Sequence, residues 1–246
     1  MNGNTWIDEY GVIYSADKKI LIECTNKEIK EYNIIPECEI IGGEEVIPED
    51  LIGFYSCAIR KAFSDCEHLQ QIHIPENVTL IGHNAFFNCA GLMSINIPNG
   101  VISIGNCAFG RCTGLTSIDI PSSVISIGDF TFNNCAGLTK IILRDGITSI
   151  GMGAFGCAKL TSIHIPESVI SIGSYAFSGC VGLTSINIPM SVTSIECFTF
   201  GDCKSLIRIS IPSSITFIDG MAFQGTRLKI RCQVRLFQLK KLLKII

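Results

Sequence analysis

Residues 112–135 read CTGLTSIDIPSSVISIGDFTFNNC, and this stretch decides the fold because close copies of it recur along the chain. The repeated pattern contains a leucine, two isoleucines separated by one residue, a proline, a second apolar pair, a glycine and an aromatic residue. The aromatic position returns every 23 residues, with one step of 22, at Phe63, Phe86, Phe109, Phe132, Phe155, Phe177, Phe200 and Phe223. Self-similarity at a short fixed period is the signature of a repeat architecture.

The residues within one copy predict its local structure. Residues 115–120 contain β-branched side chains, end in an alternation of apolar and polar residues, and stop at Pro121, which predicts a short strand. Val124 and Ile127 predict a briefer extended piece, and the stretch around Phe132 predicts one helical turn. Each repeat is therefore expected to run strand, turn, short extended segment and helical turn, which places the chain in the α/β class.

One repeat cannot bury its leucine, isoleucines and phenylalanine alone, but stacked repeats can. Equivalent positions in neighbouring coils then lie about 4.8 Å apart, the spacing of hydrogen-bonded strands. The sequence therefore predicts a solenoid with a parallel β-sheet on one face and short helical turns on another. Its seven strand-bearing repeats, of about 23 residues each, begin at Leu69, Leu92, Leu115, Leu138, Leu160, Leu183 and Leu206.

The repeated unit, Leu-x-x-Ile-x-Ile-Pro followed by Val-x-x-Ile-Gly-x-x-Ala-Phe-x-x-Cys, resembles the bacterial-surface-antigen type of leucine-rich repeat, the BspA-like family. The resemblance covers about residues 63–228 in seven near-complete copies. It implies a right-handed leucine-rich-repeat solenoid with a role in protein binding or adhesion rather than catalysis. The chain departs from the pattern at Leu143 and Arg144, where other copies have Ile-Pro, and at Glu196 and Asp219, which replace the glycine.

The N-terminal part of the chain breaks the period, as the end coil of a solenoid must in order to cover its core. Residues 1–61 are expected to form a cap built from a β-hairpin with strands at 6–14 and 19–24, a degenerate repeat at 32–42 and an insertion at 43–59. The insertion either folds over the first coil or serves as a partner-docking loop.

The solenoid itself is expected to span residues 62–227, and residues 228–246 follow it as a C-terminal segment. Strict alternation over 228–236 predicts one last strand. Further on, apolar residues at helical spacing and basic residues elsewhere predict a basic amphipathic helix. Such a helix covers the last coil with its apolar side; contact with an anionic membrane is the alternative.

The composition excludes several functional classes. Of 246 residues, 47% are hydrophobic and only 17% charged, with a net charge of −3, which excludes a disordered chain and a broadly basic nucleic-acid-binding protein. Polar residues interrupt every apolar run before it reaches the roughly 18 residues of a membrane-spanning helix. Residues 1–10 lack the pattern of a signal peptide, so a cytoplasmic protein is expected, and a secreted or cell-surface location is the alternative.

Cysteine and histidine are the remaining candidates for chemistry. One cysteine in each repeat is aligned with the others: Cys66, Cys89, Cys112, Cys135, Cys157, Cys180 and Cys203. A straight row of parallel side chains suits neither disulfides nor tetrahedral zinc, so these thiols are expected to fill a tight buried corner. His73 and His164 occupy equivalent positions four coils apart, about 19 Å, too far to share a metal or a proton. The sequence therefore predicts no catalytic site, metal or cofactor, and no enzyme activity.

The outward strand positions vary from copy to copy and form the candidate site. They are Gln71, His73, Ser94, Asn96, Ser117, Asp119, Lys140, Ile142, Ser162, His164, Ser185, Asn187, Arg208 and Ser210. Such rows also occur on any solvated sheet face, which is the alternative interpretation. If the face binds a ligand, contact across several coils suits a protein, or a glycan, better than a small molecule.

The leading functional hypothesis is a non-enzymatic leucine-rich-repeat module that binds a protein partner across this face. The alternative is a cell-surface adhesin of the BspA-like type that binds host or matrix proteins.

Overall fold

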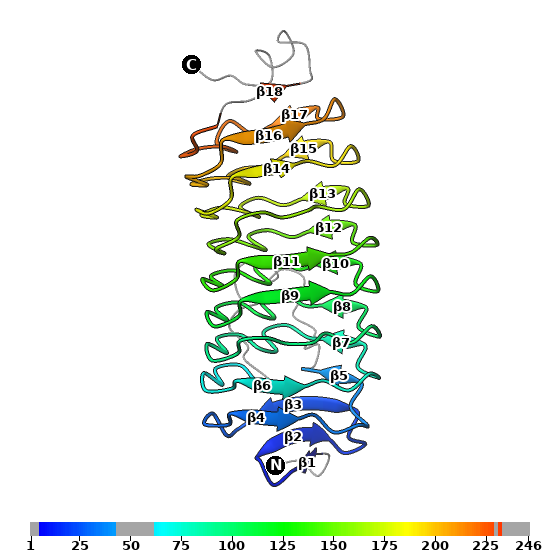
Figure 1. Ribbon diagram of the computed structural model, residues 1–246. Coiled ribbons are helices and arrows are strands. Elements are labelled where there is room, and N and C mark those ends of the chain that lie inside the picture. Colours follow the sequence, from blue (N-terminus) through cyan, green and yellow to red (C-terminus); the bar gives the residue numbers. More distant parts are fainter. Residues whose placement is uncertain (1–4, 43–61, 229–230, 233–246) are drawn as a thin grey trace.

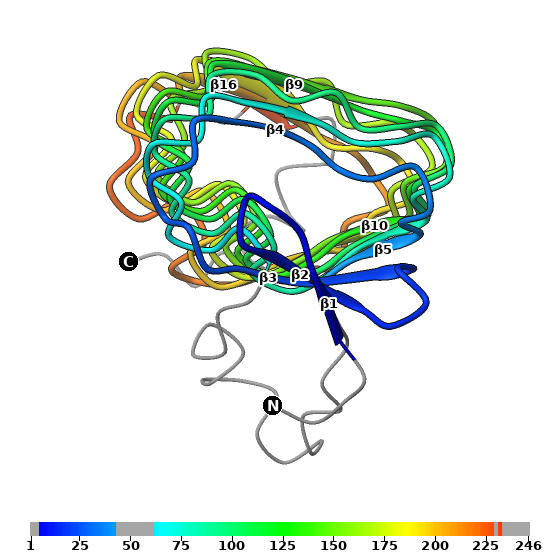
Figure 2. The same ribbon diagram turned by 90° about the horizontal axis from the view of Figure 1, so that it is seen from below.

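The computed structural model describes residues 5–42, 62–228 and the backbone of 231–232, which form a β-solenoid of about eight turns (Figure 1). Viewed along the axis, successive coils superimpose on one outline, with strands on two opposite sides (Figure 2). We call one of these sides the strand face. It carries β4 (Glu31–Asn33), β6 (Gln71–His73), β9 (Ser117–Ile120), β11 (Lys140–Leu143), β14 (Ser185–Asn187), β16 (Arg208–Ile211) and β18 (Arg231–Cys232).

The opposite side, which we call the nine-stranded side, carries a sheet in the order β1-β2-β3-β5-β7-β8-β10-β12-β13. From β3 onward its neighbours pair in parallel, and Ile127 lies between Ile104 and Ile150. A separate parallel pair, β15 with β17, lies further along the chain. The strands of this side are β1 (Thr5–Ile7), β2 (Val12–Ser15), β3 (Ile20–Cys24), β5 (Ile40–Ile41), β7 (Leu80–Ile81), β8 (Ser103–Ile104), β10 (Ser126–Ile127), β12 (Ser149–Ile150), β13 (Ser171–Ile172), β15 (Ser194–Ile195) and β17 (Phe217–Ile218).

The strand face follows the predicted alternation. In β9, Ile118 and Ile120 are buried while Ser117 and Asp119 are exposed, and Ile118 lies opposite Ile141 of β11. The ladder on this face is divided into three sheets: β4–β6, β9–β11 and β14–β16–β18. Segments 94–97 and 162–165 belong to none of them, although they keep the same alternation of exposed and inward-facing residues.

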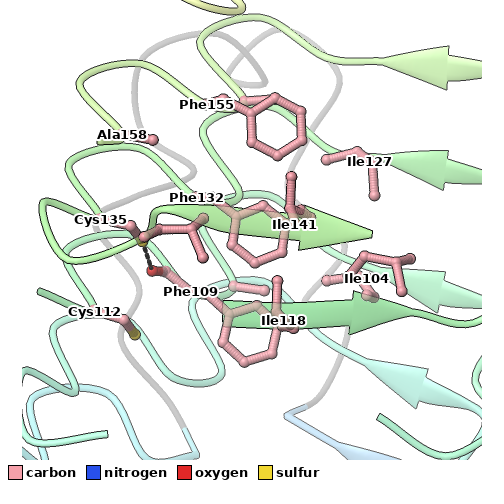
Figure 3. Packing of buried hydrophobic residues seen from close by; sticks show 14 of the residues in the cluster. Ile104, Phe109, Cys112, Ile118, Ile127, Phe132, Cys135, Ile141, Phe155 and Ala158 are labelled. Atoms are coloured by element: carbon pink, nitrogen blue, oxygen red, sulfur yellow. Dashed lines mark hydrogen bonds between the residues drawn. The ribbon is translucent and has the colours of Figure 1, made fainter. Parts of the chain in front are cut away.

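A column of phenylalanine rings runs through the core. The eight repeated rings stack on their neighbours with centroids 5.3–5.6 Å apart and planes within 18° of parallel, and three of them are drawn in Figure 3. Seven of the rings, from Phe63 to Phe200, are fully buried. Offset parallel stacking is a favourable geometry for aromatic pairs, so each coil presents the surface that its neighbour needs.

The predicted helical turns, and with them the α/β class, are wrong: the described residues contain no helix and the fold is an all-β solenoid. The residues two before and two after each core phenylalanine commonly have left-handed backbone, as at Phe130 (φ 55°) and Asn134 (φ 58°) beside Phe132. L-residues in a right-handed helix cannot alternate in this way.

Backbone hydrogen bonds show what replaces the helix. The amides of Phe132 and Asn134 donate to Ala154 and Gly156 of the next coil, both at 2.7 Å, while the amide of Asn133 donates locally to Phe130 at 3.0 Å. An α-helix would use all of these amides within its own coil. Because alternate amides bond between coils instead, the stretches around the core phenylalanines form a stack of turns joined by a ladder, which we call the turn side.

The aligned cysteines form a second ladder. The thiol of Cys135 donates to the carbonyl oxygen of Phe109 in the preceding coil at 3.0 Å (Figure 3). The same contact recurs, at 3.0–3.1 Å, for Cys89, Cys112, Cys180 and Cys203. Burial raises the pKa of the Cys135 thiol to about 12, so the thiol stays protonated and unreactive at neutral pH.

Cys157 does not belong to this ladder, contrary to the alignment of the sequence. It is exposed and has a left-handed backbone (φ 58°), whereas Ala158 is buried at the ladder position, beside Cys135 and Cys112 in Figure 3. The repeat that lacks one residue loses it between Ala158 and Leu160, after the ladder position. Aligning the repeats by residue type therefore assigned Cys157 to the ladder position, although that position is occupied by the next residue, Ala158.

The N-terminal coil closes the aromatic column. β1, β2 and β3 are antiparallel, and the ring of Tyr32 continues the column at 5.5 Å from Phe63. The Tyr32 hydroxyl donates to Asp8 at 2.5 Å and contacts the Tyr14 hydroxyl at 2.6 Å. Burial raises the pKa of Tyr14 to about 12. Tyrosine at this end lets the rings face the core while their hydroxyls remain hydrogen-bonded.

Several predicted features lie outside the described residues. These are the insertion at 43–59 and the C-terminal amphipathic helix. Of the strand predicted at 228–236, the described backbone shows β18, which pairs in parallel with β16 through Ser210 and Arg231.

The two repeats that lack the glycine keep the local turn. The amide of Thr199 donates to the Glu196 carbonyl at 3.2 Å and that of Ala222 to the Asp219 carbonyl at 3.0 Å. The equivalent bond to Gly105 measures 3.3 Å. At Gly105 a side chain would meet the backbone nitrogen of His83 at 2.6 Å, which explains the glycine there.

Candidate functional site

The strand face brings all fourteen predicted site residues onto one side of the solenoid, and every one of them is exposed. In Figure 1 the strands that carry ten of them, β6, β9, β11, β14 and β16, lie one above another. The remaining four, Ser94, Asn96, Ser162 and His164, lie on the two segments outside the ladders. The register sets neighbours 23 residues apart, so Asp119 lies beside Ile142 and Asn187 beside Ser210.

Sequence reasoning missed two extensions of this face. Glu31 and Asn33 of β4 are exposed and pair with Gln71 and His73, which adds an N-terminal coil. A third row of exposed residues precedes the strands: Gln70, Met93, Thr116, Thr139, Thr161, Thr184 and Ile207. The paired Thr-Ser of the repeat was a usable signal, because two consecutive polar residues cannot both belong to an alternating strand with one buried face.

An ion pair joins Asp119 of the face to Arg144. The Arg144 guanidinium donates to both carboxylate oxygens of Asp119, from Nε at 3.0 Å and from Nη2 at 2.6 Å. This hydrogen-bonded pairing raises the pKa of Arg144. Arg144 stands where other repeats have proline, so the departure from the repeat pattern supplies the partner of Asp119.

The face is hollowed near its N-terminal end. A cavity of about 290 Å³ lies between residues 70–72 and residues 93–96, where the strand ladder is interrupted. It contains three of the predicted site residues, Gln71, Ser94 and Asn96.

The histidines and thiols do not converge. His73 is in β6 and His164 lies in segment 162–165, several coils away, while His68 contacts Glu28 at 3.5 Å. Within residues 5–42 and 62–228, no three His, Cys, Asp or Glu side chains are grouped so that they could hold a metal ion. Nor does any helix long and apolar enough to cross a bilayer occur in that part of the chain.

Comparison with known proteins identifies the repeat. The family model for the BspA type leucine rich repeat region matches in six copies, over residues 59–180 and 138–232. The resemblance drawn from the sequence is thereby confirmed. A search of curated proteins gives no match.

Solved structures support the same fold. The chain is similar to a leucine-rich repeat protein from Eubacterium ventriosum ATCC 27560, with 25% identity, a TM-score of 0.61, and coverage of 93% of this chain and 51% of that one. It therefore spans about half of that protein's length. The T. pallidum leucine rich repeat protein gives 24% identity, a TM-score of 0.55 and coverage of 97% and 92%.

The pneumococcal vaccine antigen PcpA gives 17% identity, a TM-score of 0.54 and coverage of 88% of this chain and 66% of that one. The last two likenesses concern the fold alone. Since the family model matches well over half of the sequence, the chain belongs to the BspA type leucine rich repeat family.

Proposed function

We propose that the protein is a non-enzymatic binding module that holds a protein partner across the strand face. One observation carries the proposal: the exposed residues of this face differ from coil to coil, while the buried residues beneath them repeat. The stability of the solenoid requires only the buried residues that repeat, because they build the core. Variation of exposed side chains over a constant core is what a surface adapted to a specific partner would have.

The size of the face suits a protein. Seven coils at about 4.8 Å span roughly 30 Å. A specific protein interface buries about 800 Å² on each partner, so a partner of ordinary size would contact several coils at once. The polar residues of the face and its Asp119–Arg144 pair supply hydrogen-bonding groups of both kinds.

Charge insertion on each side tests this function. Asn96→Arg with Asn187→Arg places two cations on the strand face, and Ile102→Arg with Ile170→Arg places two on the nine-stranded side, where both isoleucines are exposed. A partner is captured with the wild-type chain from extracts of the source cells, identified and purified, and its Kd is measured for each variant. We expect at least about tenfold weaker binding for the strand-face variant and about twofold or less for the other. Equal effects, or the reverse order, would reject the strand face.

The location of the protein distinguishes a binding module inside the cell from an adhesin on the cell surface. The sequence-based expectation is a cytoplasmic protein, whereas an adhesin of the BspA-like type is displayed on the cell surface. Biotinylation of intact cells with an impermeant reagent decides between them. Labelling would favour the adhesin, and labelling only after lysis would favour the intracellular module.

A further inference from the structure

The cavity on the strand face lies between the coils of β6 and segment 94–97. β6 pairs with β4 on its other side, and the Met93 carbonyl accepts the Thr116 amide of the following coil at 3.2 Å. In the part of the chain that the structure describes, no backbone hydrogen bond joins residues 71–73 to 94–96. The peptide groups along this gap are therefore not used between the two coils, unlike those of β9 and β11.

The lining of the cavity combines apolar residues with neutral polar ones, which we call its rim. The apolar part of the lining comes from Ile72, which is half-buried, from Ile95, which is 8% exposed, and from the exposed side chain of Met93. The rim carries the carboxamides of Gln71 and Asn96 and the hydroxyl of Ser94. None of the lining residues is charged. Carboxamides and hydroxyls each both donate and accept hydrogen bonds, so the rim suits a ligand whose groups do the same.

We propose that this cavity binds a single uncharged sugar ring, a neutral hexose unit of a glycan. Ring hydroxyls both donate and accept, which matches the rim, and the C–H face of the ring suits the apolar part of the lining. The volume of about 290 Å³ is just below the roughly 300–1,000 Å³ that hold drug-sized ligands, which fits one ring. The site adds a saccharide to what the strand face binds and does not depend on the protein partner.

A protein anchor fits the cavity less well. The side chains that dominate protein interfaces are Trp, Tyr and Arg. An arginine would find no carboxylate in this lining, and an aromatic ring would leave the carboxamides and the hydroxyl without partners, which costs binding energy.

Titration of the full chain with methyl glycosides tests the site. Methyl α-glucoside, α-galactoside and α-mannoside are each added, up to about 50 mM, while backbone amide resonances are followed by NMR, with sialic acid as an anionic probe. We expect saturable shifts at Gln71, Ser94 and Asn96 for at least one neutral glycoside, with a Kd on the order of 1–10 mM. No saturable shift with any neutral glycoside, or stronger binding of sialic acid, would overturn the proposal.

Paired variants locate the binding. Asn96→Ala removes one rim carboxamide, and Asn187→Ala removes the equivalent one in β14, where the ladder with β16 is continuous. Loss of one hydrogen-bonding group should weaken glycoside binding about fivefold in the first variant and less than about twofold in the second. An equal effect of the two variants would overturn the assignment.

A peptide probe distinguishes a sugar from a protein side chain as the ligand of the cavity. N-acetyl-glutamine methylamide carries amides without sugar hydroxyls, and a response to it at these amides without a response to the glycosides would assign the cavity to a protein side chain instead. Failure of the glycoside titration leaves the capture experiment on the strand face unaffected, so the two proposals fail separately.

Discussion

The turn side of the solenoid and its strand face are built from the same repeat, yet they differ in what varies. On the turn side, phenylalanine and cysteine recur at the same depth in coil after coil, and their contacts recur to within a few tenths of an ångström. On the strand face, exposed residues change from serine to lysine to arginine over the same register. The difference teaches that the side chains that repeat and hold the core lie apart from the exposed ones that vary on the strand face, so each set can be altered alone.

Truncating one side chain on each side gives the largest contrast. Phe132→Ala opens a cavity in the middle of the aromatic column and should cost about 3–5 kcal/mol of unfolding free energy. Ile142→Ala, at an exposed position of β11, should cost less than about 0.5 kcal/mol of unfolding free energy. Urea unfolding followed by circular dichroism measures both. Similar losses would show that the strand face also holds the fold.

The next largest effect is expected from alkaline pH, which should lower the free energy of unfolding through the buried thiols of the turn side. Burial raises the pKa values of Cys135 and Cys203 to about 12, above the ordinary thiol value of 9.0. The unfolded chain therefore loses these protons first. The stability is fully present below about pH 9 and is lost as the pH rises from there to about 12, by about 1.4 kcal/mol per unit for each thiol.

Urea midpoints at pH 8, 10 and 11 measure this slope. The Cys135→Ala variant should have a shallower slope above pH 9, because one of the titrating groups is gone. A slope identical to that of the wild type would exclude the Cys135 thiol as a source of the alkaline sensitivity.

The N-terminal cap should be of intermediate sensitivity. Tyr32→Phe keeps the ring that covers Phe63 but removes the hydroxyl between Tyr14 and Asp8, at a cost of about 1–3 kcal/mol. Thermal unfolding measures the loss. Tyr10→Phe, at an exposed tyrosine, is the control and should leave the midpoint unchanged. If Tyr32→Phe also leaves it unchanged, the hydrogen-bonded closure of the column contributes nothing to stability.

Thiol labelling should distinguish the exposed cysteine from the buried ones, with no change in the stability of the protein. Cys157 is exposed, whereas Cys112 and Cys135 are buried with raised pKa values. Brief treatment of the native protein with iodoacetamide, followed by peptide mass spectrometry, should modify the peptide with Cys157 and leave those with Cys112 and Cys135 unmodified. If Cys157 stays as unmodified as Cys112 and Cys135, it belongs to the buried thiols after all.

Much of the fold followed from the period, because burial of repeated apolar side chains leaves stacking as the simplest arrangement. The alternation at Ile118 and Ile120 also set which strand residues are exposed. The turn around Phe132 was misjudged because its left-handed backbone occurs at residues such as Phe130, which do not favour that conformation on their own. Inter-coil hydrogen bonds impose it, and these cannot be read from one repeat.

For the site, the sequence was sufficient to place fourteen residues on one face but not to show the cavity. The hollow beside Ser94 lies at a break in the ladder between residues 71–73 and 94–96, whose sequences closely resemble those of paired strands. Likewise, the pairing of Arg144 with Asp119 follows from register across two coils rather than from either residue alone.

Site-specific photo-cross-linking tests the central claim most directly. A benzophenone amino acid is placed at Asn96, at Asn187 or at Ile125, an exposed residue of the nine-stranded side. Each protein is then irradiated with the partner identified by capture. If the strand face is the binding surface, the partner is cross-linked from positions 96 and 187 and not from 125. Cross-linking from position 125 alone would contradict it.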